Sequence, residues 1–198
     1  MRLLCQNAEG IFHLVPQKFN LYSRFAPLII SAAVVIADRL TKLEIQRAMP
    51  GYDSIPVISG WLRIIHTENP GAAFGMLAEG NPILRSLVLI GVSGAVLLFV
   101  AWALWSERST LNSWLSRLGL SLVLGGASGN LYDRIVNKTV TDFVEVYHGT
   151  WSFPAFNVAD SAITVGAILL LLDLWRQDPK TYGDSARIVQ EYSPIKRR

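Results

Sequence analysis

The stretch Ser86–Trp105 reads SLVLIGVSGAVLLFVAWALW, twenty residues without a charged side chain. About twenty consecutive apolar residues are needed for a helix to cross the roughly 30 Å hydrocarbon core of a bilayer. Taken alone, the segment could instead be the buried central helix of a water-soluble protein. Its length and lack of charge favour a transmembrane helix, and the rest of the chain can be judged against it.

Three further segments are apolar but contain or adjoin a charged residue. They are residues 25–37, where the helix would run past Asp38 toward Leu43; residues 111–131, in which Arg117 is the only charge; and residues 161–172, which reach spanning length only if the helix begins near Phe156 and includes Asp160. Uncharged stretches of 10–14 residues are, on their own, more typical of core helices. Beside Ser86–Trp105 they predict a mainly α-helical membrane protein with four transmembrane helices.

The composition agrees with this class. The chain has 198 residues, of which 51% are hydrophobic and 17% charged, whereas about a quarter of the residues in a soluble domain are charged. So high an apolar fraction excludes intrinsic disorder. The single cysteine, Cys5, has no partner in the chain, which excludes a disulfide scaffold. The net charge of +3 forms no basic stripe interleaved with aromatic residues, so we expect no nucleic-acid partner.

The distribution of basic residues predicts the orientation. Four spans place both termini on one side of the membrane, and eleven of the 18 Lys and Arg residues then fall on that side. Because basic residues accumulate on the cytoplasmic side, we expect both termini in the cytoplasm. Residues 1–24 contain too many polar side chains for a cleavable signal peptide. The predicted organisation is an N-terminal cytoplasmic tail (1–24), a four-helix membrane domain (25–176) and a C-terminal cytoplasmic tail (177–198).

Two outer segments read as β structure. Residues 57–65 form two short apolar runs around Ser59-Gly60, a pattern typical of a hairpin. In residues 140–147, alternation places Val140, Asp142, Val144 and Val146 on one face of a strand. We therefore expect a small extracytoplasmic β platform, built from segments near 51–67 and 139–148.

Ionisable residues within or next to a span are costly and are functional candidates by default. Because the spans alternate in direction, one membrane face collects the following residues: Asp38, Asp133, Arg134, Asp142 and Asp160. On the fourth helix Asn157, Asp160, Ser161 and Thr164 share one stripe. Helix capping is the alternative for Asn157 or Asp160, but we expect it to account for only one of them.

The third span has polar residues of its own. Asn130 and Arg134 lie one helical turn apart, and a simple ion pair between Arg134 and a carboxylate is the alternative to a site. Gly125 and Gly129 have the spacing of a helix-packing motif, and they could also let an extended peptide approach the backbone.

The candidate chemistry is hydrolysis by a pair of carboxylates. The sequence has no HExxH, CxxC or histidine cluster, and we expect no metal or cofactor. It also has no GxSxG and no evident Ser–Lys arrangement. Two aspartates that share one proton can supply both the general base and the general acid for cleaving a peptide bond.

Five motifs, in order, resemble those of lipoprotein signal peptidase (signal peptidase II). They are DRLTK at 38–42, NPGAAFG at 69–75, GGASGNLYDR at 125–134, VTDF at 140–143 and FNVADS at 156–161. Each motif alone is modest, but five in order at the expected places relative to four spans are highly specific. The resemblance covers about residues 25–176.

The resemblance implies an aspartyl endopeptidase of the bacterial inner membrane, with its active site near the outer face. Its substrates would be diacylglyceryl-modified prolipoproteins, cut just before the lipidated cysteine, and its partners would be this substrate and membrane lipid. We expect a monomer. By position, Asp142 and Asp160 match the catalytic dyad; the residues that hold the substrate backbone and the dyad geometry are Asn69, Asn130, Arg134 and Asn157; and Asp38, Asp133 and Gly71 match supporting positions.

Two other functions compete with this interpretation. A presenilin-like aspartyl protease would share the element Tyr132-Asp133, but the chain lacks GxGD and has too few spans. A small transporter or assembly factor could use acidic residues to relay protons or bind a partner. Such a protein would distribute its carboxylates through the membrane depth, whereas here they gather at one face.

Overall fold

The structure is a computed structural model that describes residues 4–6, 12–14, 21–51, 54–71, 81–106, 111 and 113–176. The predicted tail 177–198 lies outside the described residues, as does most of 1–24. Two short strands, β1 (Leu4–Gln6) and β2 (Phe12–Leu14), pair antiparallel. The fold is mainly helical with a small antiparallel sheet, as predicted.

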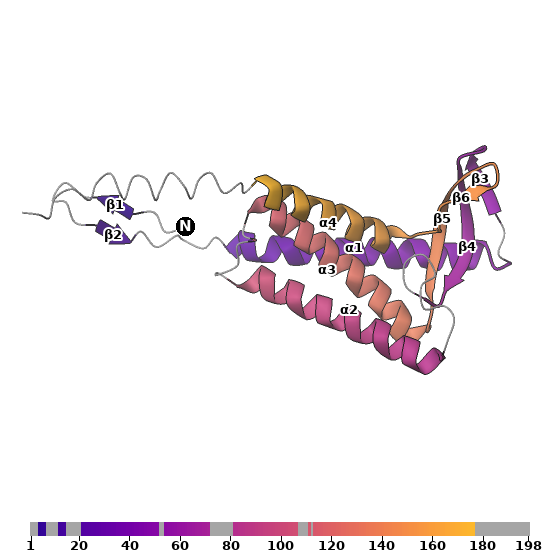
Figure 1. Cartoon of the computed structure of the whole chain (residues 1–198), viewed down its shortest axis with the longest axis horizontal. Helices are drawn as coiled ribbons and strands as arrows, with labels where there is room; N and C mark the ends of the chain where they lie inside the picture. The colour runs from indigo at the N-terminus through magenta and orange to yellow at the C-terminus, as the bar shows by residue number, and fades with distance from the viewer. Residues whose placement is uncertain are drawn as a thin grey trace, which may run out of the picture.

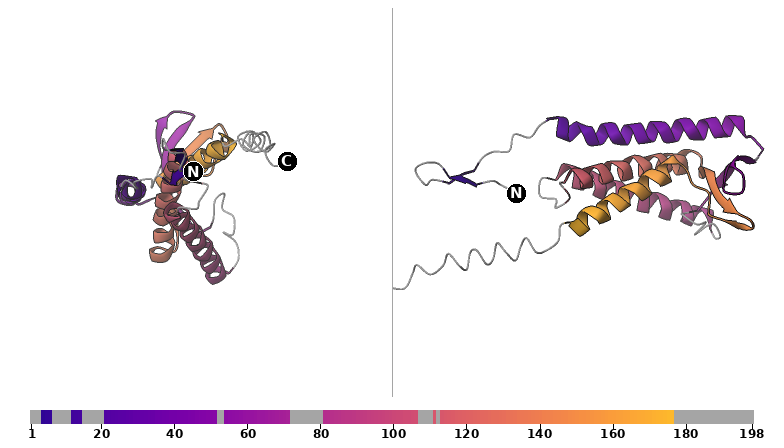
Figure 2. Two further views of the ribbon diagram at one scale, coloured as in Figure 1. Left: turned by 90° about the vertical axis from the view of Figure 1, so that its left-hand side faces the viewer. Right: turned by 90° about the horizontal axis from the view of Figure 1, so that it is seen from above.

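Four long helices run side by side, and the sheet lies at one end of them (Figure 1). They are α1 (Leu21–Ala48), α2 (Pro82–Trp105), α3 (Trp114–Val136) and α4 (Val158–Arg176). Helix α3 is central, since it packs against each of the other three. Helix α1 begins and α4 ends at the end of the bundle that lies away from the sheet (Figures 1 and 2).

Among the described helices, two are long and apolar enough to cross a membrane by length and composition alone, namely α2 and α4. Large apolar side chains on both helices point outward; Leu98 on α2 is 75% exposed and Trp175 on α4 is 83% exposed. These side chains would be costly in water and are suited to lipid. The membrane crossings of α1 and α3 remain a proposal.

Helix α1 is longer at both ends than the predicted segment from residue 25 to Leu43. Charged residues of its second half have partners, and beyond Leu43 the Gln46 side chain donates a hydrogen bond to Thr141 (2.8 Å). Lys42 pairs with Asp38 one turn earlier on α1 and with Asp133 on α3, at 2.8 and 2.7 Å. Because the partner on α3 is some ninety positions away in the sequence, the local pattern could not predict how far the helix extends.

Glycines on α3 make the contact with α1 close. A Cβ atom at Gly125 would lie 2.7 Å from the carbonyl oxygen of Ser31, and one at Gly129 would lie 2.6 Å from Asp38 Oδ2. The Gly125–Gly129 pair therefore serves helix packing, one of the two interpretations of its spacing. The other, close approach of an extended peptide, is wrong at these two glycines because α1 fills the space.

The four-stranded sheet has the order β3 (Ser54–Ile58), β4 (Leu62–Asn69), β5 (Val140–His148) and β6 (Trp151–Ser152). All neighbouring strands are antiparallel. The predicted hairpin at Ser59-Gly60 joins β3 to β4, and Gly60 has a φ of +79°, which favours glycine. After β6 the chain pairs again with β5 through Phe156 and Val144, and this brings the start of α4 against β5.

Candidate active site

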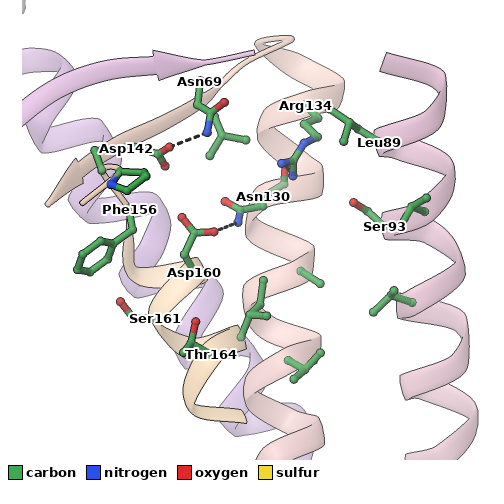
Figure 3. Close-up of a pocket in the computed structure, with 18 of the residues that line it drawn as sticks. Asn69, Leu89, Ser93, Asn130, Arg134, Asp142, Phe156, Asp160, Ser161 and Thr164 are labelled. Carbon is green, nitrogen blue, oxygen red and sulfur yellow. Dashed lines mark hydrogen bonds between the residues drawn. The ribbon is translucent and has the colours of Figure 1, made fainter. Parts of the chain in front are cut away.

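A cavity of about 650 Å³ opens where α2, α3 and α4 meet the sheet. Both candidate catalytic aspartates line it, Asp142 from β5 and Asp160 from α4, and their carboxylates point into the same space (Figure 3). The polar residues Asn69, Asn130 and Arg134 line the same region. Most of the remaining wall is apolar, so the cavity is polar at one end and apolar along the rest of its length.

Asp142 is buried, with 3% of its surface exposed. Asn69 Nδ2 donates a hydrogen bond to its Oδ2 (3.0 Å), and Asn157 Nδ2 donates one to its Oδ1 (2.7 Å). Burial raises the pKa of Asp142, and the negative charge of Asp160 raises it further; the two amide hydrogen bonds only partly oppose this, and the resulting pKa is about 6. The pKa increase marks Asp142 as a carboxyl group that can hold a proton near neutral pH.

Asp160 lies in the first turn of α4. Its Oδ1 accepts a hydrogen bond from Asn130 Nδ2 (2.7 Å), and its Oδ2 accepts one from the backbone N–H of Asn157 (3.3 Å). In return, Asn157 Oδ1 accepts from the backbone N–H of Asp160 (2.9 Å). This reciprocal arrangement is a capping box. The expectation that capping would account for only one of the two residues is wrong, because each caps the other and both also contact the site.

The same kind of contact fixes the orientation of all three asparagine amides. In each, the oxygen accepts from a group that can only donate: the backbone N–H of Gly71 for Asn69, the backbone N–H of Asp160 for Asn157, and Lys42 for Asn130. Each NH₂ group is therefore directed at an aspartate. These three NH₂ groups and the backbone N–H of Asn157 together donate to all four carboxylate oxygens of the pair.

Arg134 approaches the pair from α3. Among the described residues it forms no ion pair; its weak hydrogen bonds go to the carbonyl oxygens of Asn130 (3.3 Å) and Gly71 (3.4 Å). Its Nε is buried and has no hydrogen-bond partner in the described part of the chain. The alternative of a simple ion pair with a carboxylate is therefore not what the structure shows, and Arg134 retains donor capacity at the edge of the cavity (Figure 3).

Asp38 and Asp133 lie behind the pair rather than in the cavity. Both are fully buried and belong to an ion cluster, defined here as Asp38, Arg39, Lys42 and Asp133. Asp38 also accepts the backbone N–H of Ala159 in the first turn of α4 (3.0 Å). The sequence reasoning assigned no role to Lys42, although a lysine four residues after an aspartate on a predicted span was a usable signal.

A second network was also missed. Glu68 on β4 accepts hydrogen bonds from Thr139 (2.6 Å) and Thr141 (2.9 Å), and it contacts His66 Nε2 (3.1 Å). These residues flank Asn69 and Asp142, so the network holds β4 and β5 in register beside the pair. No metal site accompanies it: no cluster of three or more His, Cys, Asp or Glu groups suited to a metal ion occurs among the described residues.

The chain is similar to known bacterial proteins in sequence and in fold. The sequence model of the family "Signal peptidase (SPase) II" matches residues 30–176. The lipoprotein signal peptidase of Geobacillus kaustophilus is 47% identical over 146 residues, covering 74% of this chain and 90% of that protein. The one of Solibacter usitatus is 41% identical over 147 residues, covering 74% and 88%.

A solved bacterial membrane enzyme superposes with a TM-score of 0.68 at 30% identity, covering 76% of this chain and 88% of that one. The relative thus shares the fold of this chain, which consists of the helical bundle and the sheet at its end. On the family match and the extent of these identities, the chain belongs to the signal peptidase II family of bacterial membrane peptidases, which process lipoproteins.

Proposed function

We propose that this chain is an intramembrane aspartyl endopeptidase that cuts diacylglyceryl-modified prolipoproteins just before the lipidated cysteine. The observation that carries the proposal is the pair Asp142 and Asp160, which share one largely apolar cavity and whose four carboxylate oxygens each accept an N–H. The relatives named lipoprotein signal peptidase support the substrate class.

The proposed reaction uses one proton shared by the two aspartates. The ionised carboxylate takes a proton from water as the water oxygen attacks the peptide carbonyl carbon, and the protonated one gives its proton to the carbonyl oxygen. When the resulting gem-diol collapses, the carbon–nitrogen bond breaks and a proton passes to the leaving amine. The products are a carboxylic acid and an amine, and the pair regains its single proton.

The other site residues divide into two roles. Asn69, Asn130 and Asn157 hold the two carboxylates through the hydrogen bonds described above. Arg134 lines the cavity, and its terminal nitrogens make only long hydrogen bonds within the described part of the chain; they donate to a carbonyl oxygen of the substrate backbone. Supporting roles fall to Asp38 and Asp133 in the ion cluster and to Gly71, whose N–H fixes the Asn69 amide.

We further propose that α1 to α4 all cross the membrane, with both termini in the cytoplasm and the sheet outside. Asp160 and Trp175 are 175 − 160 = 15 residues apart on α4, which is about 22 Å at 1.5 Å per residue. If Trp175 marks the inner interface, Asp160 lies about 8 Å inside the outer boundary of a roughly 30 Å hydrocarbon core. Every residue of the proposed site comes from one chain, in keeping with a monomer.

The test is a reconstituted cleavage assay. Purified protein in lipid vesicles is given a diacylglyceryl-prolipoprotein, and mass spectrometry identifies the new N-terminus, with and without EDTA. The proposal predicts a single cut that leaves the lipidated cysteine first, at the same rate in EDTA. A cut elsewhere, or activity lost in EDTA and restored by zinc, would contradict it.

A further inference from the structure

Lys42 is buried on α1, with no exposed surface. Its Nζ donates hydrogen bonds to Asp38 Oδ2 (2.8 Å) and Asn130 Oδ1 (3.0 Å), and it forms an ion pair with Asp133 Oδ2 (2.7 Å). An ammonium group has three hydrogens and no acceptor, so Lys42 can only donate. Arg39 pairs with Asp133 as well, and the ion cluster therefore balances two cations against two carboxylates.

The contact with Asn130 has a consequence for Asp160. A side-chain amide can rotate by half a turn and exchange its oxygen and nitrogen with almost no change in shape. Lys42 can only donate, and together with a longer hydrogen bond from Asn157 Nδ2 (3.3 Å) it holds the Asn130 oxygen toward α1. The NH₂ group is therefore directed at Asp160 Oδ1 (2.7 Å). A reversed amide would set its NH₂ against an ammonium and its oxygen against a carboxylate.

The ion cluster also contacts α4 directly, through Asp38. Asp38, held by Lys42, accepts the backbone N–H of Ala159, the residue before Asp160. The position of the first turn of α4 and the partner of the Asp160 carboxylate thus both depend on one buried cation. The other cation of the cluster, Arg39, does not contact Asn130 in the described part of the chain. It pairs with Asp133 and lies over the ring of Tyr132.

We infer that Lys42 is a positioning residue for the proposed dyad: through the Asn130 amide and the Asp38–Ala159 contact it holds Asp160 in its working orientation. The inference rests on the proposed function, because it assigns Lys42 a role in that same site. The charged groups around this point are Asp38 and Arg39 on α1, Asp133 and Arg134 on α3, Asp142 on β5 and Asp160 on α4. The positive charge of Lys42 also acts on Asp142, lowering its pKa.

The experiment compares two variants that each remove one cation from the cluster, Lys42→Met and Arg39→Met. Only the first removes the charged donor on Asn130, leaving the longer hydrogen bond from Asn157. We expect Lys42→Met to lower kcat by about 10- to 100-fold, the cost of a misplaced reacting group, while KM changes little. Its kcat/KM profile should also shift to higher pH by about one unit, because a freed amide and a lost positive charge both favour protonated carboxyl groups. Arg39→Met should keep the wild-type profile.

Either single variant leaves the buried cluster with two carboxylates and one cation, and this uncompensated charge could prevent folding. Two charge-balanced double variants then replace them, Lys42→Met/Asp133→Asn and Arg39→Met/Asp133→Asn. Each removes one cation and one anion from the same cluster, and only the second retains Lys42 on Asn130. The inference predicts a lower kcat and a shifted pH profile for the first relative to the second.

Equal kcat and equal pH profiles in the two double variants would overturn the inference. This failure can be told apart from failure of the proposed function by measuring Asp142→Asn and Asp160→Asn in the same assay. If these abolish cleavage while the Lys42 and Arg39 doubles behave alike, only the role of Lys42 is lost. If the aspartate variants still cleave, the dyad itself is wrong.

Discussion

At the scale of single residues, the site depends on side chains that would be unfavourable elsewhere in the fold. Asp142 is an acidic group with 3% exposure, placed where the charge of Asp160 also acts on it. Its pKa of about 6 means that the folded protein resists ionising it. A raised pKa is useful to a catalytic acid, but the burial that raises it lowers the stability of the fold.

This cost predicts a pH dependence of stability. Between the ordinary pKa of 3.8 and about 6, the unfolded chain has released the Asp142 proton while the folded protein still holds it. Raising the pH through this window therefore destabilises the wild type, by at most on the order of 3 kcal/mol. Asp142→Asn cannot ionise, so its Tm relative to that of the wild type should rise between pH 4 and pH 7. Thermal unfolding in detergent measures this, and a constant Tm difference would contradict it.

Arg134 gives the second prediction at this scale. Its terminal nitrogens make only long hydrogen bonds within the described residues (3.3 and 3.4 Å), and we propose that they donate to the substrate. Arg134→Gln should lower kcat/KM by about 10- to 100-fold, the worth of one charged hydrogen bond. Membrane insertion and Tm should stay close to those of the wild type. A variant with unchanged kcat/KM would remove Arg134 from the proposed binding role.

At the scale of elements, the sequence predicts where the helices lie better than it predicts their ends and the contacts between them. The apolar run that ends in Trp105 marks α2 almost completely, because lipid-facing residues carry their own signal. Helix α1 was predicted too short, since its charged half is stabilised by Asp133 on α3, a contact that no local pattern contains. The reciprocal capping by Asn157 and Asp160 was likewise missed, although its spacing lies within one motif.

The site follows the same division. The residue types and motif order predict one site for both aspartates and the amides, and the structure places Asn69, Asn130, Asp142 and Asp160 around one cavity. The partner of each amide could not be predicted, because it depends on the close approach of α1, α3 and α4. Lys42 is the clearest case: it is fixed by Asp38, Asn130 and Asp133 from two helices.

The packing of α3 on α4 predicts a sharp difference between glycines. A Cβ atom at Gly126 would collide with the carbonyl oxygen of Ala159 and lie 2.8 Å from Ile163 Cγ1, just beside Asp160. Gly126→Ala should therefore destabilise the fold by about 1–3 kcal/mol, as overpacking does, and reduce cleavage. On α2, a Cβ at Gly91 meets nothing within 4 Å, so Gly91→Ala is the matched control. Equal Tm values for the two variants would contradict this account of the joint.

At the scale of the whole molecule, the cavity joins a polar end to an apolar body between helices. The wall below the dyad is formed by side chains such as Val92, Val96 and Ile163, and exposed apolar side chains cover the outer face of α2. Such a shape suits a peptide whose cysteine is held at membrane depth by acyl chains. Each buried CH₂ contributes about 0.8 kcal/mol, so lipid can position the substrate without specific protein contacts.

A lipid requirement follows from this arrangement. Precursor without its diacylglyceryl group should be cleaved at least about 100-fold more slowly than the modified precursor at equal total concentration. Substitutions several residues beyond the cysteine in the mature protein, as controls, should change the rate far less. Equal cleavage of lipidated and unlipidated precursor in vesicles would contradict the proposed substrate assignment.

The central claim is that Asp142 and Asp160 together activate the water that cuts the peptide. The most direct measurement is the rate of cleavage of diacylglyceryl-prolipoprotein by the wild type, Asp142→Asn and Asp160→Asn, each shown to be folded by its Tm. Because a shared proton needs both carboxyl groups, each variant should lose activity by at least about 1,000-fold, and the double variant should be hardly slower than either single one. A folded Asp142→Asn or Asp160→Asn protein that cleaves at close to the wild-type rate would contradict the account.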